Sequence, residues 1–451
     1  MNDTSTEGHA DLHVGRAKRM AERAARIIPG GVNSATRAIG EPWAFSSAKG
    51  ATITDGDGRR YTDYHAAFGA TLLGHADERV NAAIGQAIDS IDLVGLGITD
   101  LEIELAELLV DSIPSAEMVI STLSGSESVQ QAIRLARGAT GRPLVVKFQG
   151  CFHGSYDPVA RNVISTPELA YGRDPNSAGI LDDAIDNTLI AEFNDLDSVT
   201  ELFDQQPDRI AAVILEPVPH NVGALLPDHG FLEGLRELTQ KHGSVLIFDE
   251  VITGFRHALG GYQEVCGITP DLTTFGKAMG NGYPVAGMAG RADLMSHFSS
   301  AGGKVMLAGT FNGNAVSMAA AIATVKALLD PEVDFYTHVF GLGDQMRAGL
   351  RQITAEFDIP AVVTGFGSVF VTYFLEGQVR GYRDLMRNND SAYAEFHRRM
   401  IDKGSMMLPM ALKRNHISLA HTQADIDRTL DQAREVLGAM AAEGHFATKR
   451  S

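Results

Sequence analysis

The middle of the chain alternates short apolar runs with longer amphipathic stretches. The apolar runs predict buried strands at 118–122, 143–148, 210–215 and 244–249, and apolar residues at helical spacing predict helices at 100–112, 127–137 and 229–242. Strands and helices that alternate in this way indicate an α/β domain, with a mostly parallel sheet covered by helices on both faces. We therefore predict one large domain over residues 61–330.

The two ends of the chain have other patterns. Residues 12–28 have the spacing of an amphipathic helix that ends in Pro-Gly-Gly, and the alternation around Asp57-Gly58 predicts a β-hairpin. An alanine-rich helix at 314–329 is followed by two helical stretches around short strands near 361–374 and 415–419. We expect residues 331–451 to form a smaller α+β domain, and residues 1–60 to contribute to that domain and to the active site.

Composition narrows the classes of partner. The formal net charge is −18 and acidic residues are spread along the chain, which disfavours nucleic acid and anionic membranes as partners. Two cysteines are too few for a disulfide framework, and neither a secretory signal nor an apolar membrane span is visible. We expect a soluble protein in a reducing, cytoplasmic setting.

Polar residues gather where the predicted strands end, which is where ligands bind in such sheets. One strand ends in Asp249 and Glu250, within SVLIFDEVITGF. A carboxylate there requires a partner, because an unpaired buried charge is very costly. A structural salt bridge or a helix cap would supply one. In the functional alternative, Asp249 keeps the nitrogen of a pyridine ring protonated and so makes the ring an electron sink.

A lysine follows the next apolar strand, in DLTTFGKAMGNGYPVAG. Lys277 lies 28 residues after Asp249 and has three glycines close by, at positions 276, 280 and 282. A partly desolvated lysine at the end of a strand is suited to form an imine with a carbonyl compound. A lone lysine near glycines is otherwise usually a solvated surface residue.

Two more segments could surround a flat, phosphorylated ligand. SGSES joins a strand to a helix, so the backbone N–H groups of Gly125 and Ser126 can face an anion, although a simple serine cap explains the segment equally well. Phe152 could cover a planar ring with His153 beside it, or both could be structural. The spacing of Cys and His fits no metal site, and the dinucleotide motif G-x-G-x-x-G is absent after the strand.

Taken together, these segments resemble the class III aminotransferase family of fold-type I pyridoxal 5'-phosphate (PLP) enzymes. The matching stretches are PGGVNSATR (29–37), SGSESVQQAIRLARGATGR (124–142), KFQGCFHG (147–154), FDEVITGFR (248–256), PDLTTFGKAMGNGYPVAG (270–287) and GTFNGNAVSMAA (309–320). They span much of the chain, and their joint occurrence is highly specific. The resemblance implies a large PLP-binding domain and a smaller companion domain.

The resemblance also implies roles for individual residues around the cofactor ring. Lys277 would hold PLP through a Schiff base and then carry the proton that is transferred. Asp249 would pair with the pyridinium nitrogen, and Val251 and Phe152 would pack on opposite faces of the ring. His153 belongs to the same cofactor-binding set.

Further cofactor contacts follow from the same resemblance. Gly125 and Ser126 would bind the phosphate, joined by Thr310 from a second subunit, so that a homodimer is the expected working unit. Glu216 and Asn221, in EPVPHNVG, would lie beside the ring hydroxyl.

Two segments depart from the glutamate-1-semialdehyde 2,1-aminomutase branch of the family, which the chain otherwise resembles. That branch has Pro-Ser-Gln-Phe-Glu-Ala-Gly-Phe near its active site, whereas this chain has PMALKRNH at 409–416, with Lys413 in place of the glutamate. The loop thought to retain the reaction intermediate in that branch is replaced by RNVISTPELAYGRDPNSAGI. Lys413 and Arg414 could hold the carboxylate of a keto acid, or they could face solvent. Arg37 matches an arginine that binds the substrate carboxylate in this subfamily, a task suited to the fork of hydrogen-bond donors on a guanidinium group.

Three hypotheses about function result. The first is a ping-pong aminotransferase that takes nitrogen from a carboxylate-bearing amine, such as a β-amino acid, and passes it to a keto acid. The second is an aminomutase, which returns the amine to the same molecule. The third, a nucleotide-dependent oxidoreductase on a similar sheet, is disfavoured by the missing dinucleotide motif and by the position of Lys277. A non-catalytic binding protein is disfavoured further.

Overall fold

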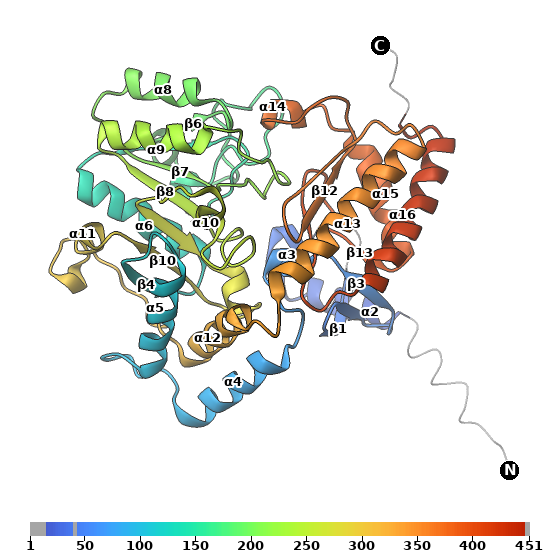
Figure 1. The fold of residues 1–451 in the computed structure, drawn as a ribbon, viewed down its shortest axis with the longest axis horizontal. Coiled ribbons are helices and arrows are strands. Elements are labelled where there is room, and N and C mark those ends of the chain that lie inside the picture. The colour runs from blue at the N-terminus through green and yellow to red at the C-terminus, as the bar shows by residue number, and fades with distance from the viewer. Residues whose placement is uncertain (1–14, 39–42, 447–451) are drawn as a thin grey trace.

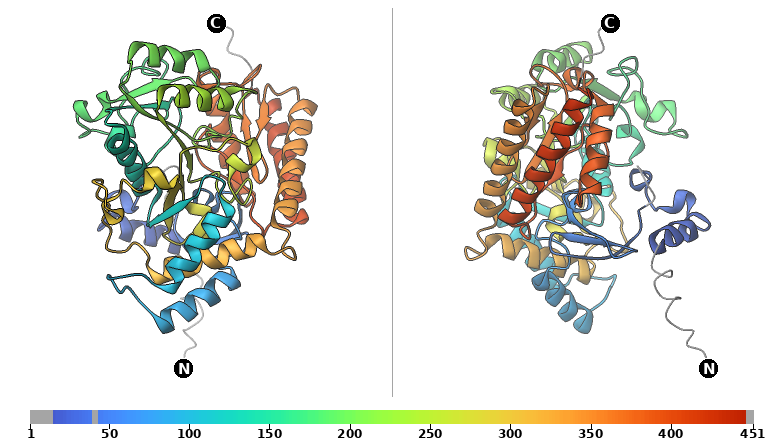
Figure 2. Two further views of the ribbon diagram at one scale, coloured as in Figure 1. Left: turned by 60° about the vertical axis from the view of Figure 1, so that its left-hand side comes forward. Right: turned by 90° about the vertical axis from the view of Figure 1, so that its right-hand side faces the viewer.

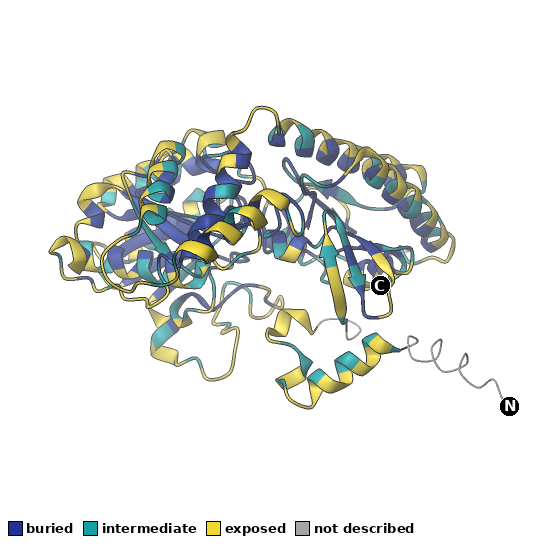
Figure 3. Ribbon diagram, turned by 90° about the horizontal axis from the view of Figure 1, so that it is seen from below, coloured by how far each residue is buried: buried dark blue, intermediate teal, exposed yellow. Residues whose placement is uncertain are grey.

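Two lobes lie side by side in a computed structural model of the chain, which describes residues 15–38 and 43–446 (Figure 1). The larger lobe is built around a seven-stranded sheet, and the smaller lobe combines two small sheets with three long helices. Buried residues concentrate inside each lobe (Figure 3). The α/β architecture with a smaller α+β companion therefore agrees with the expectation from sequence.

The large sheet is mostly parallel, as predicted. β10 runs antiparallel to both β4 and β9, while the other neighbours pair in parallel. In spatial order the strands are β4 (Met118–Thr122), β10 (Ala286–Gly290), β9 (Leu272–Phe275), β8 (Val245–Glu250), β7 (Ile210–Leu215), β5 (Leu144–Phe148) and β6 (Thr188–Ala191). The four strands predicted by residue range are confirmed as β4, β5, β7 and β8.

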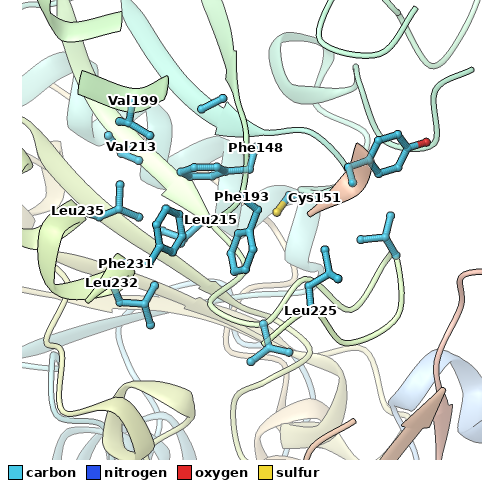
Figure 4. Close-up of a cluster of buried hydrophobic side chains, with 14 of the residues drawn as sticks. Phe148, Cys151, Phe193, Val199, Val213, Leu215, Leu225, Phe231, Leu232 and Leu235 are labelled. Atoms are coloured by element: carbon cyan, nitrogen blue, oxygen red, sulfur yellow. The ribbon is translucent and has the colours of Figure 1, made fainter. Parts of the chain in front are cut away.

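Alternate side chains of the central strands enter two separate cores, so both faces of the sheet are covered. Val213 and Leu215 of β7 pack with Phe231 and Leu235 on one face (Figure 4). Ala212 and Ile214 pack on the other face, against the helix Gly125–Thr140. Continuous apolar strands of this kind are expected where helices cover both faces of a sheet.

Two helices of the large lobe begin at reciprocal capping boxes. Ser124 and Glu127 form a reciprocal capping box at the start of α6, and Thr99 and Glu102 form another at the start of α5. The helices are α3 (Ala66–Gly69), α4 (Glu78–Ser90), α5 (Asp100–Ser112), α6 (Gly125–Thr140), α7 (Asp182–Asp186), α8 (Leu196–Gln205), α9 (Phe231–His242), α10 (Tyr262–Cys266), α11 (Ala292–Met295) and α12 (Ala315–Leu329). The predicted helices at 100–112, 127–137, 229–242 and 314–329 correspond to α5, α6, α9 and α12.

The small lobe joins segments from both ends of the chain. The predicted hairpin is present as β2 and β3, and β3 also pairs in parallel with β13 near the C-terminus. Its strands are β1 (Phe45–Lys49), β2 (Thr52–Asp55), β3 (Arg60–Asp63) and β13 (Ser405–Met406), with β11 (Val362–Thr364), β12 (Val369–Tyr373) and β14 (Asn415–His416) in a separate sheet. Its helices are α13 (Phe335–Glu356), the short α14 (Tyr382–Leu385), α15 (Asp390–Asp402) and α16 (Gln423–Ala442). The sequence pattern predicted two helical stretches here, and a third long helix is present.

The first described helix, α2 (Arg16–Ala25), stands off the side of the molecule (Figure 2). None of its residues is buried, although the backbone N–H of Ala17 donates to Asp57 at a distance of 3.2 Å. It lies within the predicted helix 12–28, whose first residues fall outside the described ones. In the described part of the chain, no helix has the length and apolar character needed to cross a membrane.

Candidate active site

Asp249 and Lys277 reach the same edge of the large sheet. Asp249 lies near the end of β8, which pairs in parallel with β9, and Lys277 comes two residues after β9 ends. The carboxyl ends of neighbouring parallel strands form the usual ligand crevice of an open α/β sheet. The strand pairing therefore brings together two residues that are 28 positions apart in the sequence.

Asp249 is buried and accepts three hydrogen bonds. Its Oδ2 lies 2.7 Å from Nδ1 of His153, and its Oδ1 accepts from the Val251 backbone at 3.1 Å and from the Thr274 hydroxyl at 3.2 Å. The opposite nitrogen of His153, Nε2, is buried and has no partner among the described residues. Asp249 is thus held in place by three neighbours.

Lys277 combines an unusual backbone conformation with a shifted pKa. Its φ is +41°, a left-handed conformation that costs a non-glycine residue of order 1–3 kcal/mol and that clusters at functional sites. Burial of the side chain and the positive charge of Arg414 lower the pKa of Lys277 to about 8, against the raising effect of Asp249. The side chain forms no hydrogen bond within the described chain. A substantial fraction of Lys277 is therefore the neutral amine that can react as a nucleophile.

The N-terminus of α6 faces the same crevice. Ser124 caps the helix, and the following residues, Gly125 and Ser126, are half-buried. A Cβ on Gly125 would come within 2.8 Å of Val251, so only glycine allows this close approach. Ser126 accepts a hydrogen bond from the Ser155 backbone at 3.1 Å. This arrangement leaves helix N–H groups beside Val251, as an anion-binding site requires.

Glu216 and Phe152 also border the crevice. Glu216 is buried, and its two carboxylate oxygens accept from the backbone N–H groups of Phe152 at 2.8 Å and His220 at 3.1 Å. Burial and the charge of Asp249 raise the pKa of Glu216 above its usual value. The Phe152 side chain is 40% exposed, so it is not a core residue within this chain.

Lys413 and Arg414 are buried beside this crevice and do not face solvent. Lys413 donates to Oδ1 of Asn221, and Nδ2 of Asn221 donates to the Gly150 carbonyl at 3.3 Å. Burial and the neighbouring Arg414 lower the pKa of Lys413 to about 7, and burial lowers that of Arg414 to about 10. Two adjacent basic side chains that are buried in this way favour an anion beside them, because the anion would stabilise their charged forms.

A turn of left-handed residues separates the crevice from a second cavity. Ala66, Ala67 and Phe68 have φ of 47°, 49° and 59°, and Gly69 follows at 89°. Such conformations cost about 1–2 kcal/mol per non-glycine residue, so the turn needs external support. Arg414 donates to the Phe68 carbonyl at 3.0 Å, and Arg256 donates to that of Gly69. The same buried arginines thus border the crevice and hold the turn.

Arg37 lies in the cavity on the other side of that turn. The cavity has a volume of about 460 Å³ and opens between the N-terminal segment and the small lobe. Arg37 is exposed at the end of a short 3-10 helix, Ala35–Arg37, and shares the cavity with Trp43, His65 and Phe68. Lys277 and Asp249 do not line this cavity. Arg37 therefore lines a cavity that adjoins the crevice through the turn, because Phe68 lines this cavity while its carbonyl accepts from Arg414.

Thr310 lies in a different hollow. It is exposed and borders an open depression of about 440 Å³, together with the segment 92–99. None of the residues that line this depression is Gly125 or Ser126. Within one chain, Thr310 therefore stands apart from the predicted phosphate site.

The loop that replaces the aminomutase sequence is tied to the large sheet by buried polar contacts. Gln149 donates to Ser165 at 3.0 Å and accepts from the side chain of Asn162 at 3.0 Å and the backbone of Tyr171 at 2.9 Å. The hydroxyl of Tyr382, in the small lobe, accepts from the Ser165 backbone N–H at 2.7 Å and donates to its carbonyl at 2.8 Å. This loop is thus anchored from both lobes.

Several residues at the site have no recognisable signal in a single sequence. Thr274 supports Asp249, Arg256 and His416 lie buried beside Arg414, and Asp63 holds the left-handed turn. Arg256 lies in the motif FDEVITGFR, which is the one signal that pointed to it. Thr274 and His416 lie in the stretches 270–287 and 409–416, but their contacts with Asp249 and Arg414 arise only in the folded chain.

The residues at the crevice fit PLP as a cofactor. A buried carboxylate, a lysine of lowered pKa and a helix N-terminus match a pyridinium nitrogen, an aldehyde and a phosphate. Fold and site together define a fold-type I PLP-dependent enzyme.

Comparison with known proteins specifies the family. Residues 36–437 match the family Aminotransferase class-III, and the chain belongs to this family. It is 42% identical to a glutamate-1-semialdehyde 2,1-aminomutase of Alkaliphilus oremlandii (strain OhILAs), over 94% of this chain and 99% of that protein.

Solved structures of similar fold include transaminases. An omega-transaminase from Sphaerobacter thermophilus has a TM-score of 0.88 and 33% identity, covering 96% of this chain and all of that one. A β-phenylalanine aminotransferase from Variovorax paradoxus has a TM-score of 0.85 and 28% identity, covering 96% and 97%. The cofactor of this chain is PLP, as in its family.

Proposed function

We propose that this enzyme is an aminotransferase that moves nitrogen from a carboxylate-bearing amine to a keto acid. The observation that carries the proposal is the pair of buried basic residues, Lys413 and Arg414, beside the crevice that holds Lys277. A keto acid brings a carboxylate to the reacting centre, and this anion would offset the free-energy cost of burying Lys413 and Arg414. Similarity to a β-phenylalanine aminotransferase supports a β-amino acid as donor.

Residues of the crevice would divide the work on the cofactor. Bound PLP supplies a carbonyl group that takes up nitrogen and a ring that stores an electron pair. Lys277 would link to the cofactor through Nζ and then move a proton between carbon atoms, as its lowered pKa allows. Asp249, oriented by His153, would hold the ring nitrogen protonated. Phe152 and Val251 would enclose the ring, and a pair of N–H groups would bind its phosphate.

Four more residues would contact the phosphate and the ring hydroxyl of the cofactor. Gly125 and Ser126 would donate their backbone N–H groups to the phosphate. Glu216 and Asn221 would lie beside the ring hydroxyl, since both are buried next to Phe152 and the Gly150 carbonyl. Arg37 would bind the carboxylate of the amino donor from the neighbouring cavity.

We also infer that the working unit is a homodimer. Thr310 lies beside three exposed apolar side chains, Val94, Leu96 and Ile98, which are 58%, 88% and 65% exposed. Exposed apolar side chains that gather on one surface mark protein contacts. A second copy packed on this surface would cover them and would bring Thr310 to the phosphate site of its partner.

Aminomutase activity is the second candidate, and the 42% identity to a protein of that name favours it. An aminomutase must retain its substrate between two half-reactions, whereas an aminotransferase must release it. The buried Lys413, which stands in place of a glutamate, and the firmly anchored loop at 161–180 both favour release.

A single half-reaction separates the two candidates. The PLP form of the enzyme is mixed with α-, β- and ω-amines, its visible absorbance is followed, and the products are identified. We expect loss of the absorbance with free keto product from at least one carboxylate-bearing amine. If only glutamate-1-semialdehyde or its diamino partner reacts, and the nitrogen returns to the neighbouring carbon, the aminotransferase proposal is wrong.

A further inference from the structure

We infer that His65 is a specificity-determining residue whose Nε2–H donates a hydrogen bond to the donor carboxylate, beside Arg37. The inference rests on the proposed function, because it concerns the amine whose carboxylate Arg37 would bind. His65 caps the left-handed turn and lines the cavity that contains Arg37. No sequence motif pointed to it.

The hydrogen bonding of His65 fixes which nitrogen carries the proton. The backbone N–H of Phe68 donates to Nδ1 of His65 at 3.2 Å, so Nδ1 must be the unprotonated nitrogen. Burial and the charges of Arg414, His397 and Arg37 lower the pKa of His65 to about 4, against the raising effect of Asp63. The ring is therefore neutral near pH 7, and its one proton is on Nε2.

The position of the ring is fixed as firmly as its protonation. Oδ1 of Asp63 accepts from the backbone N–H of His65 at 2.9 Å and from that of Ala66 at 3.1 Å. The Phe68 ring packs edge-on against the imidazole, with 4.3 Å between ring centres. Held on three sides, His65 presents an N–H group that loses little freedom when a ligand binds.

Among the three histidines that line this cavity, only His65 leaves its Nε2 nitrogen available for a ligand. Nε2 of His75 is bound to Asp63 at 2.7 Å, and Nε2 of His397 is bound to the Met407 carbonyl at 3.1 Å. By contrast, Nε2 of His65 has no partner among the described residues and is not fully buried, and no described residue pairs with the Arg37 guanidinium. A guanidinium and a neutral N–H match the two oxygens of a carboxylate.

The rest of the cavity indicates what the carboxylate is attached to. Its lining also includes Trp43, Ile53, Phe68, Met407 and Pro409, which are mostly apolar. A volume of about 460 Å³ accommodates an aryl or branched aliphatic group in addition to the carboxylate. The geometry therefore favours an amine in which the carboxylate and a bulky apolar group lie close together, as in 3-amino-3-phenylpropanoate.

Two substitutions of His65 separate its hydrogen bond from its structural role. His65→Asn keeps an acceptor for the Phe68 N–H, since asparagine is a favoured capping residue, but leaves the Nε2 position empty. His65→Gln places an amide N–H near the Nε2 position instead. Folding of both variants is checked by chemical denaturation, and cofactor binding by the visible absorbance of bound PLP.

The substrates form a matched set. 3-Amino-3-phenylpropanoate carries the carboxylate, 1-phenylethylamine is the same amine without it, and 3-phenylpropanoate is the same acid without the amine. For His65→Asn we expect about a tenfold rise in KM for the first and in Kd for the last, the loss expected for one hydrogen bond to a charged group. The reaction with 1-phenylethylamine and the kcat should be unchanged, and His65→Gln should recover part of the loss.

Each other outcome counts against a specific statement. An unchanged Kd for 3-phenylpropanoate in His65→Asn means that His65 does not touch the carboxylate. An equal loss with 1-phenylethylamine means that His65 only supports the turn. If the rise in KM appears for the keto acid and not for the amine, the carboxylate in the cavity is that of the acceptor, and the assignment to the donor is wrong. If the wild-type enzyme does not prefer 3-amino-3-phenylpropanoate to 1-phenylethylamine, the proposed donor class itself is wrong.

Discussion

Two aspartate–histidine pairs, one in each lobe, have the same contact distance and serve different ends. Asp249 lies 2.7 Å from His153 near the end of β8, and Asp63 lies 2.7 Å from His75 at the end of β3. Each carboxylate also accepts two further hydrogen bonds. Only Asp249 lies beside a lysine of lowered pKa, whereas Asp63 holds a left-handed turn.

The comparison teaches that a buried ion pair does not by itself mark chemistry. The two pairs differ in the groups that surround each aspartate. Nε2 of His153 is buried and has no hydrogen-bond partner among the described residues, and Asp249 lies at the crevice together with Lys277. All donors around Asp63 come from its own turn and from His75. The functional pair is the one whose neighbours include groups without a hydrogen-bond partner. Groups with perturbed pKa values that cluster in one crevice are therefore a better guide to function than a buried pair alone.

Replacing Asp249 should have the largest effect on turnover. Asp249→Asn keeps the shape of the side chain and acceptors for Val251 and Thr274, but it removes the charge opposite a protonated ring nitrogen. Removing one member of a buried charge pair costs about 3–5 kcal/mol, which corresponds to roughly a 10²–10⁴-fold loss in kcat/KM. Single-turnover rates of the amine half-reaction would measure it.

Glu250, the next residue of β8, provides a matched control. It is buried as deeply as Asp249, but its donors are Thr253, Tyr262 and Gln263, which lie away from the crevice residues. Glu250→Gln should therefore lower stability and leave the half-reaction nearly unchanged. If Asp249→Asn retained more than a tenth of wild-type kcat/KM, the Asp249–His153 pair would be structural, and the contrast between the two lobes would disappear.

Replacing Asp63 should affect stability and substrate binding while sparing the cofactor. Asp63→Ala leaves the N–H groups of His65 and Ala66 without an acceptor, which costs about 1–3 kcal/mol for each buried group. Urea denaturation would measure the loss in the free energy of unfolding. The released turn should also raise KM for carboxylate-bearing amines.

The visible absorbance of bound PLP should survive Asp63→Ala, because Asp63 does not line the crevice. Asp63→Asn, which keeps one acceptor oxygen for the turn, should lose less stability. Loss of PLP binding from folded Asp63→Ala protein would show that the small-lobe pair supports the cofactor as well, against the division drawn here.

The large lobe could be predicted from sequence because its signals are local. Apolar runs such as VLIF at 245–248 predict a strand in any context, and the residues that follow it reach the crevice wherever parallel strands pair. Asp249 and Lys277 were predicted as site residues for this reason, and the structure brings them to one edge. The burial of Lys413 and Arg414 was left open by sequence, since Lys and Arg are ordinarily exposed.

The second cavity could not be predicted, because its parts meet only through tertiary pairing. His65 follows β3, whose position depends on pairing with β13 some 340 residues later. The left-handed φ of Ala66 and Ala67 has no sequence signal, since alanine favours helices and rarely adopts such angles. Hydrogen bonds of the turn with Asp63, Arg256 and Arg414 impose this conformation and outweigh the preference of alanine for a helix.

Replacing the partner histidine of Asp63 should have the smallest effect. His75 is partly exposed, with 18% of its side chain accessible, and a partly solvated ion pair contributes only about 0.2–1 kcal/mol. Burial alone would raise the pKa of Asp63, but the hydrogen bonds from His75 and from the backbone of Ala66 lower it below the usual range. The stabilisation is therefore present above pH 4 and is lost as the pH falls below the usual pKa of an aspartate.

For His75→Gln we expect a small loss in the free energy of unfolding at pH 7 that shrinks toward acidic pH, with the turn still held by Asp63. Chemical denaturation at pH 7 and near pH 3 would measure both values. A loss at pH 7 as large as that of Asp63→Ala would mean that the histidine, and not the backbone of the turn, is the main partner of the carboxylate. The Asp63 pair would then resemble the Asp249 pair, where a histidine orients the aspartate, and the two lobes would differ only in what their aspartates face.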